Sequence, residues 1–410
     1  MSGKNNKNWT VPVVEDLRPE YYDRFHCLAA GCRFSCCKGW SITFDKKDYL
    51  SLRRQGGSPE LTDKLEHGVR RIRKREHIHY GEFDMDSGTC PLLGEDSLCI
   101  LQKERGHEAL PEVCQTFPRT EAYLTGYLER SLSTACEGVL QLLWDLPHRM
   151  EFVSDPLPKR AAKEMSVEED GTLLPFFTPV REVCIDLLQD SRLSLPQRIF
   201  LLGAALKELA DGEEDIARWA VRARMLPGMP GAAELLSAAD AEKALPLFLS
   251  NNIHVLSGAS VSGTLMLSVK AEVLSAHRLE VSEDLDSTTI PLGPYLDARA
   301  RFEANFSDHP YFMENLMVAL FFHLHMPNAV ARAELWKSYV NFCNLYSFFR
   351  YMAVMSCREG ATGDRAELFR MLVFASRSLI HNGTHQQALQ DHLFRSDSAT
   401  LAHMAILLGG

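Results

Sequence analysis

Cysteines are concentrated in the first third of this chain. The sequence has 410 residues and 11 cysteines, and eight of the cysteines precede residue 140. Thiolates are soft ligands that suit zinc ions and iron–sulfur clusters. Thiolates packed together without a cation repel one another, so such a group requires metal, oxidation or raised pKa values. We therefore expect a metal site built from Cys27, Cys32, Cys36, Cys37, Cys90, Cys99, Cys114 and Cys136.

The spacing of these cysteines leaves the metal open. Four of them form the pattern Cys27-x4-Cys32-x3-Cys36-Cys37, whose gaps fit a zinc knuckle. The later four, from Cys90 onwards, contain no C-x2-C pair, so spacing does not separate zinc from iron–sulfur. Neighbouring side chains of an extended backbone point to opposite sides. Cys36 and Cys37 therefore serve different roles, or the chain turns sharply there.

Ordinary packing is the alternative explanation, because cysteine is among the residue types most often buried. It accounts poorly for eight cysteines within 110 residues against three in the remaining 270 or so. A metal or redox role explains that contrast better.

Composition excludes several other classes of protein. The net charge is −10, with the first 150 residues near neutral and the rest acidic, so neither part has the basic face of a nucleic-acid binder. The N-terminus lacks the apolar stretch of a secretory signal, and no long apolar run is present. We expect a cytoplasmic protein without a transmembrane segment, whose thiols stay reduced.

The rest of the chain must position the cysteine group. Residues 1–145 read as a small, irregular, cysteine-rich metal-binding domain, in which bound metal replaces part of an apolar core. Residues 146–174 are rich in proline, charge and small side chains, which is typical of a linker. Residues 175–410 show mostly helical periodicity. The predicted fold is mainly α, with the cysteine-rich domain packed on a larger helical C-terminal domain.

Helix signals are clearest after residue 190. Leu195, Ile199 and Leu202 begin an apolar stripe, and Ser194 with Gln197 forms a capping box. One segment, Ser262–Leu274, is the best strand candidate. The remaining predicted helices cover Phe44–Gly57, Ser58–Glu76, Val180–Gln189, Glu213–Met225, Tyr311–His325, Ala331–Cys357, Ala366–His381 and Ala399–Leu408.

A few other side chains are candidates for the site. Trp40 and Phe117 flank cysteines, where aromatic rings either shield a cluster or simply pack. Arg377 and His381 stand four apart on a predicted helix and share a face; a surface pair is the default, and a site role is the alternative. The segment "HLHMP", from His323, marks either a helix end beside a cleft or a set of core histidines.

Three blocks resemble the flagellin lysine-N-methylase family. The first is "YYDRFHCLAAGCRFSCCKGWSITFDKKDYLSL", with its CC-x-GW signature. The second is "GTCPLLGEDSLCILQKERGHEALPEVCQTFPRT", and the third is "LSTACEGVLQLLW", which reads Cys-Glu-Gly where relatives usually read Cys-Pro-Glu-Ala. These blocks also resemble the zinc- or iron-chelating cysteine-domain family. Near the end, "RMLVFASRSLIHN" is similar to a Ser-Arg-x-x-x-His segment of the methylases. The strong resemblance covers roughly residues 18–145, and the match over 180–410 is weak.

The resemblance implies methyl transfer from S-adenosylmethionine to the ε-amino group of lysines on flagellin. It also implies a [4Fe–4S] cluster held by the cysteine-rich motif, with zinc as the alternative; we expect four of the eight cysteines to hold it, and which four is open. The remaining cysteines are structural or bind a second metal. A radical-type C-x3-C-x2-C motif and a G-x-G-x-x-G loop are both missing, so adenosylmethionine requires another kind of site.

Two hypotheses of other classes stand beside the enzyme. One is a non-catalytic zinc-binding module, in which zinc stabilises a helical domain that binds a partner. The other is metal storage or delivery. A lysine methyltransferase must also obtain a neutral amine, although the reference pKa of lysine is about 10.4. The sequence does not nominate a catalytic residue for that step.

Overall fold

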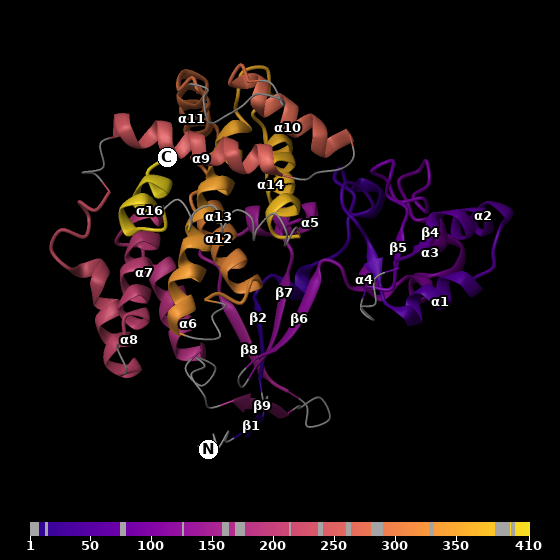
Figure 1. Ribbon diagram of the computed structural model, residues 1–410, viewed down its shortest axis with the longest axis horizontal. Coiled ribbons are helices and arrows are strands. Elements are labelled where there is room, and N and C mark those ends of the chain that lie inside the picture. The colour runs from indigo at the N-terminus through magenta and orange to yellow at the C-terminus, as the bar shows by residue number, and fades with distance from the viewer. Residues whose placement is uncertain are drawn as a thin grey trace.

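A computed structural model describes the backbone of residues 8–12, 15–73, 79–124, 127–157, 164–168, 177–212, 215–236, 241–259, 264–279, 290–327, 332–381, 394 and 398–410. It is mainly helical, as predicted. Figure 1 shows a large group of helices, which we call the helical body, beside a smaller region at the right of the view. The helices of the body are α5 (Glu137–Trp144), α6 (Phe177–Leu188), α7 (Leu195–Ala210), α8 (Ile216–Met225), α9 (Ala241–Gly258), α10 (Thr264–Ala276), α11 (Gly293–Asn305), α12 (Phe312–His323), α13 (Leu335–Met355), α14 (Arg365–Leu379) and α16 (Leu401–Leu408).

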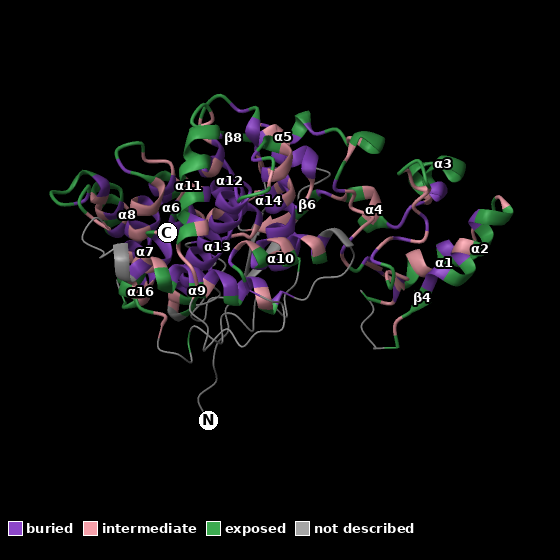
Figure 2. Ribbon diagram, turned by 90° about the horizontal axis from the view of Figure 1, so that it is seen from above, coloured by how far each residue is buried: buried purple, intermediate pink, exposed green. Residues whose placement is uncertain are grey.

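Helix α13 lies at the centre of the helical body. It packs against α7, α9, α11, α14 and α16. Its side chains are buried on almost every face, which is the pattern of a helix inside a core rather than on a surface. Figure 2 shows the buried residues gathered along these central helices. The capping box predicted before α7 is confirmed, and the backbone N–H of Ser194 donates to Gln197 Oε1 at 2.9 Å.

A four-stranded sheet lies under the helices, in the strand order β6-β7-β2-β8. Strand β2 runs parallel to β7 and antiparallel to β8, while β6 and β7 form an antiparallel pair. Helix α12 packs on β7, which carries the buried Leu128 and Leu132. The strands are β2 (Glu15–Pro19), β6 (Arg119–Leu124), β7 (Tyr127–Leu132) and β8 (Phe152–Pro156).

Two strands lie within residues 146–174, where the sequence indicated a linker. Besides β8, strand β9 (Glu164–Glu168) pairs antiparallel with β1 (Asn8–Pro12). The segment therefore contributes to two sheets, and the domain limits drawn from the sequence stay a prediction.

Residues 37–117, which we call the small lobe, have their own sheet and core. Three short strands pair in the order β3-β5-β4. Leu52, Leu61 and Leu101 are fully buried in a core separate from that of the helical body. The elements of the lobe are α1 (Lys46–Arg54), α2 (Pro59–Gly68), α3 (Ile100–Arg105), α4 (Glu112–Thr116), β3 (Thr43–Phe44), β4 (Val69–Arg71) and β5 (Gly81–Phe83).

Two sequence predictions need correction. The predicted strand Ser262–Leu274 is wrong, because α10 occupies this region and buries Met266, Val269 and Val273 at helical spacing. The predicted helix Ser58–Glu76 ends early: α2 stops at Gly68 and the chain enters β4. The last residues of that prediction lie outside the described residues.

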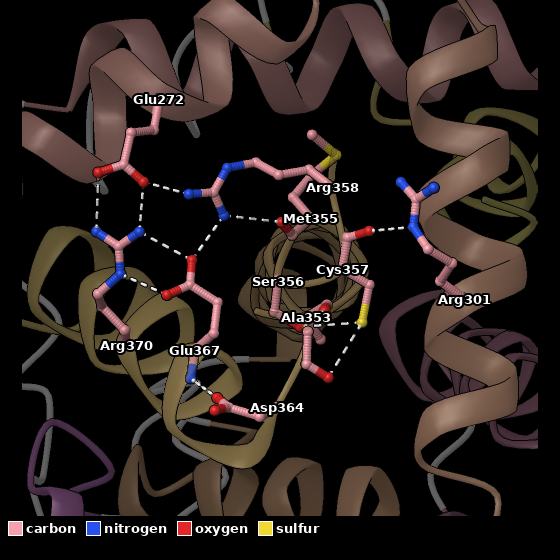
Figure 3. Close-up of polar contacts among 11 residues, drawn as sticks. Glu272, Arg301, Ala353, Met355, Ser356, Cys357, Arg358, Asp364, Glu367 and Arg370 are labelled. Atoms are coloured by element: carbon pink, nitrogen blue, oxygen red, sulfur yellow. Dashed lines mark hydrogen bonds and ion pairs between the residues drawn. The ribbon is translucent and has the colours of Figure 1, made fainter. Parts of the chain in front are cut away.

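A network of charged side chains fixes α10 against α14, as Figure 3 shows. Glu272 of α10 pairs with Arg358 and Arg370, and both arginines also contact Glu367. The Arg358 Nη1–Glu367 Oε1 distance is 2.6 Å, and the Arg370 Nε–Glu367 Oε2 distance is 2.8 Å. Because α14 also carries Arg377, this network helps to place one wall of the site described next.

Candidate functional site

A cleft of about 970 Å³ lies between the small lobe and the helical body. Its walls include Trp40 and Phe117 from the lobe and Met266, Arg377 and His381 from the body. Six of the eight predicted cysteines line it, namely Cys27, Cys36, Cys37, Cys90, Cys99 and Cys114. The fold therefore brings together thiols that are up to 87 positions apart in the sequence.

The thiols are spread along the walls of this cleft. All the cysteines are free. Within the described part of the chain, no three Cys, His, Asp or Glu side chains lie close enough together to hold a single metal ion. The predicted set of metal ligands stays a prediction.

The CC-x-GW segment forms a tight turn at the edge of the cleft. Gly39 has a φ of +83°, a conformation that favours glycine, and its N–H donates to the carbonyl of Gly88 at 2.9 Å. The Trp40 Nε1–H donates to the carbonyl of Cys36 at 2.6 Å. The backbone N–H of Cys90 donates to the carbonyl of Cys37 at 2.8 Å. The turn thus holds Trp40 over the cysteine pair and ties Cys37 to the lobe.

Arg377 of α14 binds this turn from the side of the helical body. Its guanidinium donates to the carbonyls of Lys38 at 2.8 Å and Phe34 at 2.6 Å, and more weakly to that of Ser35 at 3.2 Å. It also lies over the Trp40 ring, 4.9 Å from the centroid. The side chain is buried, at 4% exposed. The default interpretation of Arg377 as a surface residue is therefore wrong, and its contacts place it in the site.

His381 lies beside Arg377 in the cleft wall. Its ring packs edge-on against Trp40 at 4.8 Å between centroids, and its Nε2 is 2.8 Å from Ser133 Oγ. The surrounding protein and the charge of Arg377 lower the pKa of His381 to about 4, although the residue as a whole is solvent-exposed. The imidazole is therefore neutral at pH 7. Phe117 packs edge-on against the other side of Trp40 at 5.1 Å.

A buried polar network lies behind this wall, on strand β7. Glu129 pairs with Arg181, whose Nη1 is 2.6 Å from Glu129 Oε1, and His325 Nδ1 lies 3.3 Å from the same carboxylate. Ser131 Oγ contacts His323 Nδ1 at 2.9 Å. Burial, with the charges of His381 and His325, lowers the pKa of His323 to about 3.

The segment "HLHMP" is thus both a helix end and part of the core, since His323 closes α12 and is buried. Sequence reasoning missed Glu129 and Arg181. The stretch "YLERSL" places Glu129 beside Arg130 and Ser131, so it carries no clear signal that Glu129 is buried.

Cys32 and Cys136, the remaining two cysteines, lie at the start of α5. Cys136 is the residue before the helix, and Glu137 accepts from the backbone N–H of Arg33 at 2.6 Å and from its Nε at 2.7 Å. Gly138 lets the preceding loop approach, because a Cβ there would be 3.3 Å from the Phe25 ring. The loop that carries Cys27 and Cys32 is therefore packed on the helical body.

Burial keeps most of these thiols protonated when no metal is bound. It raises the pKa of Cys32 and Cys114 to about 12 and that of Cys136 to about 11. Cys37 differs, because a hydrogen bond with Cys36 lowers its pKa to about 7. A metal ligated by these groups would have to displace their protons.

Fold and site together define a helical protein whose N-terminal cysteines face the end of a C-terminal helix across one cleft. Residues 181–407 match the family model of the FliB lysine N-methylase C-terminal domain. The chain belongs to the FliB lysine N-methylase family, which confirms the resemblance seen in the sequence. The family model covers the half of the chain where the sequence resemblance is weak.

Three relatives carry names related to this family. The chain is 28% identical over 190 residues to a "Lysine-N-methylase" of Salmonella typhimurium strain LT2, and 27% identical to one of Salmonella choleraesuis. These alignments cover 45% of this chain and 45% of either relative, so they span under half the length of each protein. A "Flagellar biosynthetic protein FliU" of Salmonella muenchen is 34% identical over 137 residues, which is 32% of this chain and 78% of that protein. No solved structure matches the chain.

Proposed function

We propose that this chain is a protein-lysine N-methyltransferase that acts on flagellin, uses S-adenosylmethionine and binds an iron–sulfur cluster in the cysteine-lined cleft. The observation that carries the proposal is the contact between two distant family-like segments. Arg377 of the Ser-Arg-x-x-x-His segment binds the carbonyl of Lys38 in the CC-x-GW segment and that of Phe34 just before it, more than 330 residues earlier. A contact of this kind is expected if both segments build one site. The names of the relatives support lysine methylation and a flagellar role.

The donor set suits an iron–sulfur cluster. Cysteine thiolates are the usual ligands of such clusters, and each iron takes its own thiolate. A cluster therefore suits thiols that are spread along a cleft. A single ion suits them less well, since it requires all its ligands at one point. Cys36, Cys37 and Cys114 are among the residues able to hold it. When bound, a cluster supplies a redox centre and Lewis-acidic iron.

The cleft walls suit the second requirement, a neutral lysine amine. A charged ammonium is disfavoured in surroundings of low polarity, and the walls include the rings of Phe25, Trp40 and Phe117. His381 is neutral at pH 7, so it is able to accept a hydrogen bond from the amine and orient it. With a pKa of about 4, it is a hydrogen-bond acceptor and not a store for the proton.

The test is methyl transfer to flagellin under anaerobic conditions. Purified protein with its metal intact is incubated with labelled S-adenosylmethionine and flagellin, and lysine modification is measured by mass spectrometry. We expect label on flagellin lysines. If metal-loaded protein transfers no label to flagellin, the proposed activity is wrong.

A pair of variants tests the assignment of His381. We expect His381→Asn to lower kcat by on the order of 100-fold, since the amine loses its acceptor. His148→Asn is the matched control, because His148 is half-exposed and pairs with Glu20 on another part of the molecule. Equal rates for the two variants would remove His381 from the mechanism.

A further inference from the structure

We propose that the outer edge of strand β6 is the docking site for an extended segment of the protein substrate, and that this docking places a lysine of the segment in the cleft. The inference rests on the proposed function and deepens it, because it states how the substrate backbone is held. Strand β6 begins directly after Phe117 and Pro118 of the cleft wall. Figure 1 shows it as the strand of its sheet nearest to the small lobe.

Strand β6 forms one edge of the four-stranded sheet. It pairs antiparallel with β7 on one side. Among the residues that the structure describes, no strand pairs with its other side, and β7 is the element against which it mainly packs. A sheet edge presents a row of backbone donors and acceptors that match those of an added strand. The chemistry of this surface therefore fits a peptide backbone.

The pairing register shows which backbone groups face the outer edge. The N–H of Ser133 donates to the carbonyl of Pro118 at 2.9 Å, and these two residues continue the register of β6 with β7 by one position. Hydrogen-bonded and non-hydrogen-bonded positions alternate along an antiparallel pair. Thr120 therefore bonds to β7, whereas the N–H and C=O groups of Arg119 and Glu121 point outward. Both of these outward-facing residues are exposed.

The same edge borders the cleft at its first residues. Arg119 and Thr120 line the cleft, as does His381. Side chains that are directly opposite in a sheet lie on one face, so Thr120 shares a face with Ser131. Ser133 is two residues further along the same strand direction and also lies on that face. Its Oγ is 2.8 Å from Nε2 of His381, so this face of the sheet leads to the histidine.

A strand added beside β6 would lie about 4.8 Å beyond it. Its residue opposite Thr120 would present its side chain on the face that leads to His381. The four-carbon stem of a lysine at that position carries the amine into the cleft. The adjacent residues of the segment point to the opposite face. The edge thus recognises an extended, lysine-bearing segment by its backbone.

A proline variant tests the outer edge and leaves the hydrogen bonds to β7 in place. Proline is tolerated on an edge strand where its missing N–H would face outward. Glu121→Pro removes one outward N–H and puts a ring in the path of an added strand. We expect the KM for flagellin to rise at least about tenfold, with a much smaller change in kcat.

Ser154→Pro is the matched control at the opposite edge of the same sheet. The N–H of Glu20 donates to the carbonyl of Glu151 at 3.0 Å. The register of β2 with β8 then places the N–H of Ser154 on the outer side of β8. Ser154 is exposed and lies outside the described lining of the cleft. This variant should therefore keep the wild-type KM.

Hydrogen exchange on the wild-type protein gives a second measurement that does not depend on a variant folding. Amide exchange is followed anaerobically with and without flagellin. We expect flagellin to slow exchange in β6 and not in β8. Bound flagellin without slower exchange in β6 overturns the inference, as does a wild-type KM in Glu121→Pro. Slower exchange in β6 that depends on protein concentration alone would show a second copy of this chain at the edge, and would also overturn it.

The docking inference and the proposed function fail in different ways. If the wild-type protein methylates flagellin while exchange in β6 is unchanged, only the docking inference is wrong. If flagellin slows exchange in β6 but receives no label, the docking is correct and the proposed methyl transfer is wrong. If flagellin neither slows exchange in β6 nor receives label, both are wrong.

Discussion

The small lobe and the helical body are stabilised in different ways. The body has one large apolar core around α13, whereas the lobe buries twelve residues in a core of its own. A region of about 80 residues with one small core usually gains only 3–5 kcal/mol from it and often needs a metal or a disulfide. The lobe also carries four of the eight N-terminal cysteines. If the proposed metal binds there, it would replace apolar packing in the lobe, while the body provides a rigid wall.

The largest effect should follow from metal removal. Anaerobic chelation is expected to raise amide hydrogen exchange in α1, α2 and α3 by at least about 100-fold, and to leave α13 unchanged. Hydrogen-exchange mass spectrometry on the loaded and chelated protein measures both regions in one experiment. An equal rise in the two regions would show that they form one folding unit, and no rise in the lobe would show that its apolar core is sufficient.

Loss of Arg377 should have the next largest effect, because this side chain joins the two regions. Arg377→Gln removes a buried cation and leaves the carbonyls of Phe34 and Lys38 without their donor. The expected loss is about 3 kcal/mol in the free energy of unfolding, measured by chemical denaturation.

Arg365→Gln is the matched control for Arg377→Gln. Arg365 is exposed at the other end of α14, and its substitution should cost under about 0.5 kcal/mol. Similar losses for the two variants would contradict a joining role for Arg377.

Glycine-to-alanine substitutions allow a direct comparison of packing in the two regions. A Cβ at Gly203 of α7 would overlap Cζ of the buried Tyr339, whereas one at Gly81 of β5 would lie 2.6 Å from Cε2 of the buried Phe44 and 2.7 Å from Cδ2 of the half-buried Tyr49. The overlap at Gly203 is the more severe of the two. We expect Gly203→Ala to cost about 2 kcal/mol and Gly81→Ala about 1 kcal/mol in thermal or chemical unfolding.

Gly31→Ala is the reference for the glycine comparison. No atom lies within 4 Å of the Cβ position at Gly31, so this substitution should be nearly neutral. A larger loss at Gly81 than at Gly203 would mean that the lobe is the more tightly packed region.

Much of the helical body was predictable, and the contacts between regions were not. The helices ending in Ala210 and Leu379 carry local signals, such as a capping serine and an apolar stripe. The four-stranded sheet was missed because β2 and β7 are short and pair across more than 100 residues. Cysteine type and clustering predicted a metal site built from eight thiols; six of them line one cleft, and their metal binding stays a prediction. A site role for Arg377 was only the alternative to a surface pair, because its partners are distant in the chain and helical spacing alone does not distinguish a buried face from an exposed one.

A further predicted effect concerns acid and is specific to the helical body. His323 is buried beside Ser131 and near His381 and His325, and its pKa of about 3 is below the value of about 6.5 expected in the unfolded chain. Below pH 6.5 the unfolded chain therefore binds a proton that the folded chain excludes. Stability is fully present above pH 6.5 and falls as the pH is lowered towards 3. Between pH 7 and pH 5, this residue should lower the free energy of unfolding by about 2 kcal/mol.

The variant His323→Asn keeps an amide near the position of Nδ1, for contact with Ser131, but does not titrate. Chemical denaturation of wild type and variant at pH 7, 6 and 5 should therefore give the variant the shallower pH dependence. Other groups, including metal ligands, contribute equally to the pH dependence of the free energy of unfolding in both proteins, provided that both carry the same metal. Their contributions therefore cancel when one slope is subtracted from the other. Acid is expected to destabilise the helical body, whereas chelation is expected to destabilise the small lobe. Hydrogen exchange at pH 5 should therefore increase first in α12 and β7. Equal slopes for the two proteins would show that His323 is already protonated in the folded state. Acid would then not destabilise the helical body through this residue, and the two regions would not differ in this respect.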